Sequence, residues 1–393
     1  MLIKKVIAKS VRNSRGEKTI KVIVKTSKGK FVTSAPAGKS KGKFEVKSYA
    51  GSLNGDIGVV NGFDVDKLNN LKLKKFNDLK KVERIIGKRL GANSLFALEA
   101  SLLKAMAREN NQKLWRFLNP RKINFKIRSV GNAIGGGLHS QGVRGKKPDF
   151  QEFLFITDTD NFSECVRINK IAYKLVKKYL GFWSRRNDES AWETGETNER
   201  VLQIMKKISE VIGEKRKLEI GVDIASSSFY KNGKYFYKNP LRELNKERQI
   251  NYIEKLIGKY NLFYVEDALE ENDFSGFAEL TRHVGERCLI VGDDLIATNP
   301  RRLKKAIKMK SINAVIVKPN QIGSLIKVRE VIELAHKNGI KCIISHRSGE
   351  TKDNTIADLG VGFRCDFIKT GIYGKVREAK LKRIVEIEKM IKK

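Results

Sequence analysis

The chain has 393 residues and carries 80 lysines and arginines against 44 aspartates and glutamates, a formal net charge of +36. A chain of this length is too long to fold around one small hydrophobic core, so we expect two domains or one large barrel with an appendage. No apolar run approaches the roughly 20 residues that span a bilayer, and the first residues lack the apolar segment of a signal peptide. Four separated cysteines without a CxxC pair indicate a reduced protein, and we expect a cytoplasmic location without membrane contact.

The excess of positive charge favours polyanionic partners, which makes weak nucleic-acid binding a candidate interaction. The lysines are nevertheless spread along the whole chain and are rarely interleaved with aromatic residues. The densest stretches, "LKLKKFNDLKK" and "RRLKKAIKMK", have helical spacing, which is typical of solvated helix faces. Charge alone therefore does not identify the function.

The first part of the chain is predicted to be a small α+β unit. Residues 2–11 and 19–33 favour strands, with a turn at Gly29 inside the second stretch. The loop "SAPAGKSKGKF" follows, and we expect it to be mobile. Residues 93–110 have the apolar spacing of an amphipathic helix, and "LNPRKIN" indicates a linker. We place the N-terminal domain at residues 1–122.

Residues 123–393 alternate between apolar runs of strand length and helical stretches. The helix in "TNERVLQIMKKISEVIG" is expected to end at Gly213. This alternation predicts parallel strands, and about eight of them fit a (β/α)₈ barrel. An open doubly wound sheet is the alternative, but no GxGxxG follows the first strand. The runs are "FKIRSVG", "EFLFITD", "KLEIGVD", "NLFYVED", "CLIVGDD", "NAVIVKP", "KCIISHR" and "CDFIKTG".

Ionisable side chains stand at the carboxyl ends of six of these runs. In a barrel those ends meet at one mouth, where barrel enzymes carry out their chemistry. Any one of these residues could simply be solvated, but their common register points to a site. Carboxylates on successive strands supply the oxygen ligands that suit Mg²⁺. The residues are Asp223, Glu266, Asp293, Lys318, His346 with Arg347, and Lys369.

Carboxylates followed by lysines indicate a type of reaction. Mg²⁺ beside a substrate carboxylate neutralises it and allows an adjacent C–H group to lose its proton. The base must be neutral near pH 7, which a lysine achieves when burial and a second cation lower its pKa. Lys318 and Lys369 fit this requirement, and the enolase superfamily uses such a lysine with Mg²⁺.

The motifs of the chain resemble those of the enolase family along nearly its whole length, in order. In the barrel these are "GVDIASSSFYKNGKY", "VEDALEENDFSGF", "VGDDLIATNP", "VKPNQIGS", "ISHRSGET" and "FIKTG". Before and at the start of the barrel they are "SRGEKTIKVIV", "APAGKSKG", "LGANS" and "FQEFLF". The resemblance implies an enolase-type (β/α)₈ barrel after an α+β domain, and the dehydration of 2-phosphoglycerate to phosphoenolpyruvate.

The resemblance also implies roles for single residues. Asp223, Glu266 and Asp293 would hold a first Mg²⁺, and Ser40 would help to hold a second. Lys318 would remove the C2 proton. The catalytic residues would be Lys318, Glu189, Glu152, Lys369 and His346. The substrate would touch His139, Glu152, Glu266, Asp293, Ser345, His346, Arg347, Ser348 and Lys369.

In this scheme Glu189, with Glu152 beside it, would assist the departure of the C3 hydroxyl group. Lys369 would bind the substrate carboxylate and help to lower the pKa of Lys318. Arg347 and Ser348 would hold the phosphate, a task to which the arginine fork is suited.

Two segments depart from the family pattern. The stretch that usually reads GDEGGFAP is "RNDESAWET" here, and the lid segment "SQGVRGKKPDF" is longer and more basic than usual. Two alternative functions stay open for this reason. One is a related enzyme that acts on another phosphorylated or phosphonate hydroxyacid, and the other is an inactive enolase-like protein that binds nucleic acid. The resemblance further implies a homodimer or larger homo-oligomer.

Overall fold

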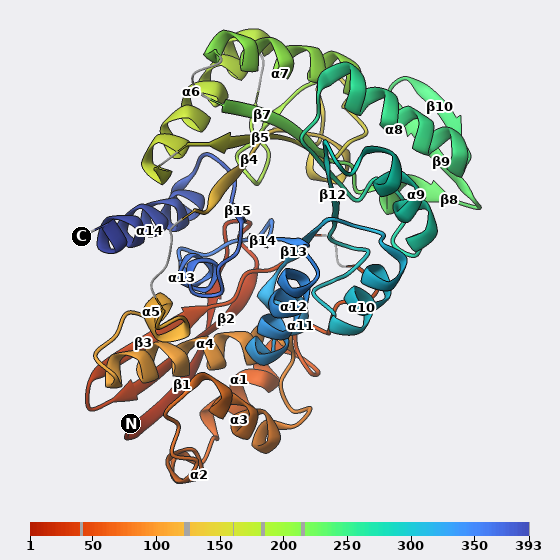
Figure 1. Cartoon of the computed structure of the whole chain (residues 1–393). Helices are drawn as coiled ribbons and strands as arrows, with labels where there is room; N and C mark the ends of the chain where they lie inside the picture. The colour runs from red at the N-terminus through yellow and green to blue at the C-terminus, as the bar shows by residue number, and fades with distance from the viewer. Residues whose placement is uncertain (40–41, 122–125, 160, 182–184, 214–216, 393) are drawn as a thin grey trace.

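The computed structural model describes residues 1–39, 42–121, 126–159, 161–181, 185–213 and 217–392. A small α+β part at the amino end lies against a closed barrel formed by the rest of the chain (Figure 1). The predicted boundary between residues 122 and 123 lies outside the described residues, so its position stays a prediction. In the part of the chain that the structure describes, every helix is too short or too polar to cross a membrane.

The N-terminal part begins with a three-stranded antiparallel sheet formed by β1 (Ile3–Arg12), β2 (Lys18–Thr26) and β3 (Gly29–Ser34). Alternate residues of β2 point into the core, where Ile20, Val22 and Val24 are fully buried. The amphipathic helix α4 (Ala92–Glu109) packs on β2 and β3. The predicted strands and this helix are therefore confirmed within one or two residues.

Four further helices and one 3₁₀ turn complete the N-terminal part. The helical spacing noted in "LKLKKFNDLKK" overlaps only the 3₁₀ turn and the start of the helix that follows it. The other three helices were not predicted, because with nine residues or fewer they are too short to show a helical period. The helices and the turn are α1 (Leu53–Asn61), α2 (Val65–Asn70), η1 (Phe76–Asp78), α3 (Leu79–Ile86) and α5 (Leu114–Leu118).

The eight apolar runs of the second part are the eight strands of a barrel that closes through hydrogen bonds between the last strand and the first. Its interior is filled by apolar side chains such as Ile156, Ile316 and Phe367. The strands are β4 (Arg128–Gly135), β5 (Glu152–Asp158), β7 (Lys217–Asp223), β11 (Tyr264–Glu266), β12 (Leu289–Gly292), β13 (Ala314–Val317), β14 (Lys341–Ser345) and β15 (Phe367–Lys369).

The expectation of parallel strands is wrong for β5, which runs antiparallel to both of its neighbours, β4 and β7. The connection from β4 to β5 contains no crossover helix, so the chain returns in the opposite direction. Two long helices, α6 (Phe162–Leu180) and α7 (Asn198–Ile212), then lead from β5 to β7 and restore the original direction. As predicted, α7 ends at Gly213, which has a φ of +88°.

Helices on the outside of the barrel link the remaining strands, and one further helix follows β15 (Figure 1). They are α8 (Lys246–Tyr260), α9 (Phe274–Val284), α10 (Pro300–Met309), α11 (Pro319–Ile322), α12 (Leu325–Lys337), α13 (Thr355–Gly362) and α14 (Lys375–Lys392). Short elements near the mouth are η2 (Gly137–His139), β6 (Trp192–Glu193), η3 (Ser226–Phe229), β8 (Tyr230–Lys231), β9 (Lys234–Lys238) and β10 (Leu241–Leu244).

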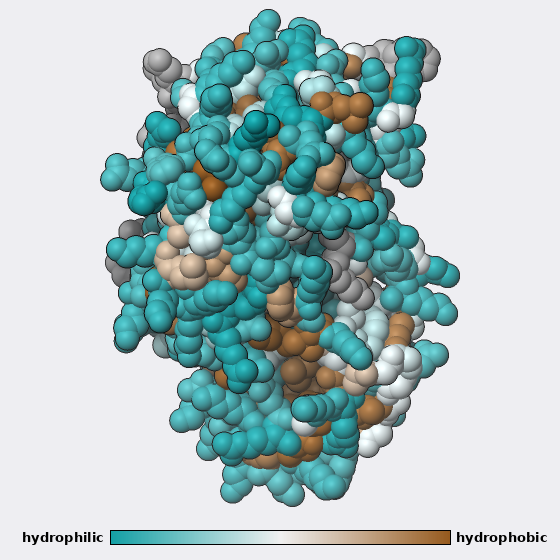
Figure 2. All heavy atoms as spheres, turned by 90° about the vertical axis from the view of Figure 1, so that its right-hand side faces the viewer, coloured by the Kyte–Doolittle hydropathy of each residue, from teal (hydrophilic) through white to brown (hydrophobic). Residues whose placement is uncertain are grey.

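Hydrophilic side chains cover most of the face drawn in Figure 2, and apolar ones gather in its lower half, at the level of the N-terminal part. The two parts of the chain approach closely at the start of α4. A Cβ on Gly323 would lie 2.7 Å from the Cα of Ala92, so the tight contact requires glycine there.

A buried carboxyl group joins the two parts at this contact. Glu99 of α4 is fully buried, and one of its oxygens accepts a hydrogen bond of 2.7 Å from the backbone N–H of Leu325 at the start of α12. Burial, together with the charge of Glu83, raises the pKa of Glu99 well above its ordinary value. The fold therefore favours the protonated form of Glu99.

We predict that Glu99→Gln leaves the protein at least as stable as the wild type at pH 7. The raised pKa means that the folded state holds a proton that the unfolded state releases above about pH 4.3. The wild type thus loses stability as the pH rises above that value, and glutamine, which does not ionise, avoids this loss. Thermal unfolding followed between pH 4 and 8 measures the difference.

Glu99→Leu is the matched control, because it removes the acceptor for the N–H of Leu325. Leaving this buried donor without a partner is expected to cost about 1–3 kcal/mol. A Gln variant that is destabilised as strongly as the Leu variant would contradict a neutral Glu99.

Candidate active site

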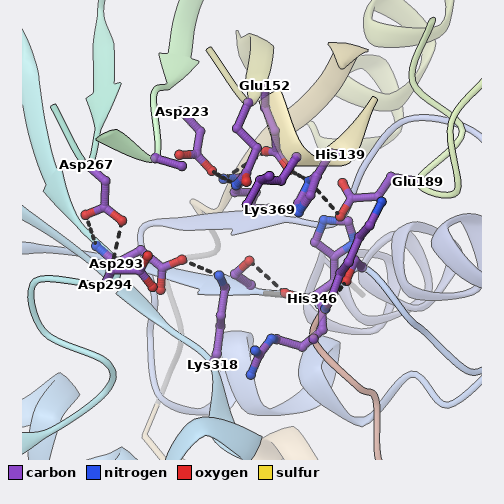
Figure 3. Close-up of a pocket in the computed structure, with 18 of the residues that line it drawn as sticks. His139, Glu152, Glu189, Asp223, Asp267, Asp293, Asp294, Lys318, His346 and Lys369 are labelled. Carbon is purple, nitrogen blue, oxygen red and sulfur yellow. Dashed lines mark hydrogen bonds and ion pairs between the residues drawn. The ribbon is translucent and has the colours of Figure 1, made fainter. Parts of the chain in front are cut away.

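A polar cavity of about 60 Å³ lies at the carboxyl ends of the barrel strands. The strand ends supply most of its lining, and the N-terminal part adds Gly38, Lys39 and Glu45. Figure 3 shows the ionisable side chains that point into it from β5, β7, β12, β13 and β15 and the loops that follow them. The strand ends therefore converge as the sequence analysis predicted.

Lys369, at the end of β15, lies at the centre of the carboxylates. Its Nζ atom is 2.9 Å from Glu152 Oε2, 3.1 Å from Asp223 Oδ2 and 2.7 Å from Glu266 Oε2. Burial alone would lower the pKa of Lys369, but the three carboxylates raise it well above its ordinary value. Lys369 is thus a permanent cation.

The carboxylates around Lys369 repel one another. Asp223 and Glu266 end neighbouring strands and are directly paired in the sheet register. Burial raises the pKa of Asp223 and of Glu266. The charges of Glu152 and Asp293 raise the pKa of Asp223 further, the charge of Asp223 raises that of Glu266, and Lys369 opposes both shifts. The ammonium group of Lys369 therefore stabilises a cluster that would otherwise favour protonation.

Lys318 follows β13 and faces Asp293, which follows β12. Its Nζ atom forms an ion pair with Asp293 Oδ2 (Figure 3). Burial would lower the pKa of Lys318, but Asp293 raises it, and the net shift is upward. This direction is opposite to the one that we expected for a general base, because the protein's own carboxylate holds the proton on the lysine.

Two further aspartates belong to this side of the cavity, and sequence reasoning missed them. Both oxygens of Asp267 are used in positioning, since they accept the backbone N–H groups of Asp293 (3.0 Å) and Asp294 (2.9 Å). Burial and the charge of Asp293 raise the pKa of Asp294 to about 7. The doubled acids in "VED" and "VGDD" were the available signal.

The residues present fit a divalent cation. Asp223 Oδ1 and Glu266 Oε1 are buried oxygens that accept no hydrogen bond from the described residues. Carboxylate oxygens of Asp267, Asp293 and Asp294 also lie within 4.8 Å of one another. Hard oxygen donors without protein partners are the ligands that Mg²⁺ and Ca²⁺ take. Ser40, expected to help with a second ion, lies outside the described residues.

The opposite wall of the cavity is formed by His139, Glu152 and Glu189. The Nδ1 atom of His139 lies 3.5 Å from one oxygen of each glutamate. Burial would lower the pKa of His139, but the two carboxylates raise it. Burial would raise the pKa of Glu189, but the positive charge of His139 lowers it. The proton of this group therefore resides on His139, while Asn132 donates a hydrogen bond of 3.2 Å to Glu189.

The loop that carries Glu189 has the unusual sequence noted above and a tight local structure. The side-chain oxygen of Asn187 accepts the backbone N–H groups of Glu189 (3.0 Å) and Ala191 (2.9 Å). Ser190 has a φ of +65°, a left-handed conformation that favours glycine. Ser190 thus stands where the family pattern has glycine, and its backbone keeps a glycine-like geometry.

The segment after β14 combines groups from three places in the chain. Arg347 binds both oxygens of Glu45 at 2.9 and 3.0 Å. The Oγ atom of Ser348 accepts the backbone N–H of Lys39 at 2.7 Å. The carbonyl groups of Arg347 and Ser348 each accept a hydrogen bond of 2.6 Å from the guanidinium of Arg377 on α14. An arginine and a serine are thereby held at the cavity wall.

The buried charge of Arg377 also acts on a histidine in this segment. Burial and the nearby Arg377 hold the pKa of His346 well below its ordinary value, so His346 is neutral. Sequence reasoning missed Arg377, and it missed Glu45. The signal for Arg377 was its place, with Lys380, on the apolar face of α14.

The structure brings the described predicted residues together at one mouth. Most line the cavity directly, and Glu266 lies behind them against Lys369. The lining includes His139, Glu152, Glu189, Asp223, Asp293, Lys318, Ser345, His346, Arg347, Ser348 and Lys369.

Comparisons with known proteins agree with this architecture. Residues 3–118 match the family model of the enolase N-terminal domain, and residues 128–393 match that of the enolase C-terminal TIM barrel domain. The enolase of Thermoplasma acidophilum is 38% identical over 309 residues, which cover 77% of this chain and 75% of that protein. The enolase of Methanosphaera stadtmanae is 41% identical over 312 residues, or 76% and 74% of the two chains.

A third relative gives the same result. The enolase of Pyrobaculum aerophilum is 39% identical over 324 residues, which cover 80% of this chain and 75% of that protein. Both family models and these identities, over three quarters of each chain, establish the assignment. The chain belongs to the enolase family, whose members are hydro-lyases that dehydrate 2-phosphoglycerate.

Proposed function

We propose that the chain converts 2-phosphoglycerate to phosphoenolpyruvate with Lys318 as the base. In this reaction Lys318 takes the proton from C2, the electron pair of that bond forms the C2–C3 double bond, and the C3–O bond breaks. The leaving hydroxyl group takes a proton and departs as water. The observation that carries the proposal is the placement of two buried lysines opposite three strand-end carboxylates in one cavity.

The metal is proposed to be Mg²⁺, with two ions in each site. Asp223, Glu266 and Asp293 would hold one of them, and Ser40 would contribute to the second. When bound, Mg²⁺ neutralises these carboxylates and the substrate carboxylate, which makes the C2 proton more acidic and weakens the hold of Asp293 on the Lys318 proton. The orphaned oxygens of Asp223 and Glu266 support this assignment.

The proton for the leaving group would come from the wall opposite Lys318. Glu189, with Glu152 beside it, would deliver this proton to the C3 oxygen. His139 has a raised pKa and lies 3.5 Å from both glutamates, so it would keep a proton available to them. Glu189 is neutral only transiently in this scheme, because its own pKa is lowered.

The substrate's two anionic ends would be bound at separate places. Lys369 is buried and permanently charged, which suits it to the substrate carboxylate. Arg347 and Ser348 would hold the phosphate, with neutral His346 and Ser345 completing the contact surface. The fixed backbone of residues 347 and 348 beneath Arg377 supports this role.

From the family resemblance we propose that the protein is a homodimer or a larger homo-oligomer in the cytoplasm. Size-exclusion chromatography at moderate salt would measure the oligomeric state. Weak nucleic-acid binding remains a prediction from the net charge of +36. Binding of that kind should weaken steeply as salt rises.

We predict that Lys318→Ala lowers kcat by at least about 100-fold, the usual contribution of a general base. Turnover is measured as the ultraviolet absorbance of phosphoenolpyruvate formed from 2-phosphoglycerate and Mg²⁺. A chelator should abolish wild-type turnover, and added Mg²⁺ should restore it.

Lys327→Ala, an exposed lysine on α12, is the matched control and should keep wild-type rates. A rise in melting temperature with Mg²⁺ in both variants would show that the metal ligands are intact. Full activity in Lys318→Ala would exclude Lys318 as the base. A folded, Mg²⁺-binding wild type without turnover would favour another phosphorylated or phosphonate substrate.

We further predict that Ser190→Gly raises the melting temperature and leaves kcat/KM within about twofold of the wild type. A left-handed conformation costs a residue with a side chain roughly 1–2 kcal/mol, and glycine removes this cost. Ala191→Gly is the control. Ala191 is buried and does not share the positive φ, so glycine there should lower stability by about 0.5–1 kcal/mol. A large loss of activity in Ser190→Gly would mean that the loop depends on the serine side chain itself.

A further inference from the structure

The turn between β1 and β2 reaches the mouth of the barrel and is bonded to the segment after β14. The backbone N–H of Ser14 donates to the carbonyl of Glu350 at 2.7 Å, and the N–H of Glu350 donates to Ser14 Oγ at 3.1 Å. A Cβ on Gly349 would lie 2.5 Å from the amide nitrogen of Asn13 and 2.9 Å from the carbonyl oxygen of Ala37, and the backbone contact requires glycine there. The turn is therefore fixed relative to the cavity.

This turn carries Arg15, whose guanidinium contacts three different groups. Nη1 donates to Ser348 Oγ at 3.3 Å, Nε lies 3.5 Å from Asp188 Oδ2, and Nη2 donates to Glu17 Oε1 at 2.8 Å. The side chain of Arg15 is only 17% exposed and that of Asp188 only 24% exposed, so solvent screens their attraction incompletely. Neither residue lines the cavity itself.

Ser348 and Asp188, the two partners of Arg15 that are distant from it in the sequence, belong to different parts of the site. Ser348 lies in the segment proposed to hold the phosphate. Asp188 directly precedes Glu189, which is proposed to serve the leaving hydroxyl group. Asn187 fixes the backbone of Glu189 and Ala191, so a shift of Asp188 is transmitted to Glu189 rather than absorbed by the loop.

We propose that Arg15 and Asp188 are a positioning pair, in which Arg15 of the N-terminal part sets the distance between the phosphate segment at Ser348 and the loop that carries Glu189. The inference rests on the proposed function. A planar guanidinium presents its donors in a rigid fork, whereas the three donors of an ammonium group rotate freely. Lys39 also contacts both residues, since its backbone N–H donates to Ser348 Oγ at 2.7 Å and its Nζ lies 4.0 Å from Asp188 Oδ2, but its ammonium group lies farther from Asp188 than the guanidinium of Arg15 does.

Substitutions of Asp188 and of Arg15 are expected to have different kinetic effects. Asp188→Asn should lower kcat by roughly 10- to 100-fold with little change in KM, because misplacement of a catalytic group raises the barrier. Arg15→Gln should lower kcat to a similar extent and also raise KM, because Ser348 Oγ loses the hydrogen bond from Arg15 and keeps the one from the N–H of Lys39. Arg15→Lys should recover KM in part but not kcat.

The double variant Arg15→Gln with Asp188→Asn tests whether the residues act as a pair. Its kcat should be no lower than that of Arg15→Gln alone, since the same link is already broken. Arg12→Gln is the matched control. Arg12 is the last residue of β1, next to the turn, and its side chain donates only to the carbonyl of Gly16 at 2.6 Å among the contacts that the structure describes. It should keep wild-type kinetics.

Hydrogen exchange gives a readout that does not depend on turnover. The amide groups of Glu189, Ser190 and Ala191 should exchange faster in Arg15→Gln and in Asp188→Asn than in the wild type or Arg12→Gln. The proposal would be overturned if the kcat losses of the two single variants multiplied in the double variant. It would also be overturned if these amides exchanged at the wild-type rate in the single variants. A wild type without turnover on 2-phosphoglycerate would instead refute the proposed function, and the exchange result would still decide the link.

Discussion

The mouth of the barrel depends on one buried ammonium group. Lys369 holds the carboxylates of Glu152, Asp223 and Glu266 within 3.1 Å of a single nitrogen. These acids come from strands whose ends the barrel forces together, so their repulsion is a consequence of the fold itself. Removing one partner from such a buried cluster leaves uncompensated charge, which is strongly destabilising. The same cluster leaves oxygens on Asp223 and Glu266 for a cation to bind.

Both parts of the chain contribute residues to the site. The barrel supplies the lysines and carboxylates, whereas Lys39, Glu45 and the turn with Arg15 come from the N-terminal part. Backbone contacts between Ala37 and Gly349 join the two at 2.7 and 2.8 Å. An anionic substrate would therefore be enclosed by groups that meet only when the two parts are docked.

Much of the barrel and of its mouth was predictable because both rest on local patterns. β-branched runs marked each strand. Because the strand ends of a barrel meet at one mouth, residues such as Asp223 and Lys369 were expected to lie together. The direction of β5 was not predictable, since it depends on whether a helix intervenes. Glu45 and Arg377 were missed because their importance arises from long-range packing. The raised pKa of Lys318 was missed for the same reason, as it follows from the approach of Asp293.

Helix α14 has a consequence for how the protein tolerates truncation. Two of its side chains, Arg377 and Lys380, are almost completely buried and bind the carbonyl groups of Arg347, Ser348 and Thr351. These bonds fix the segment at the cavity wall. A chain shortened by that helix would retain its acids and lysines, but the cavity wall at residues 347 and 348 would lose the groups that support it.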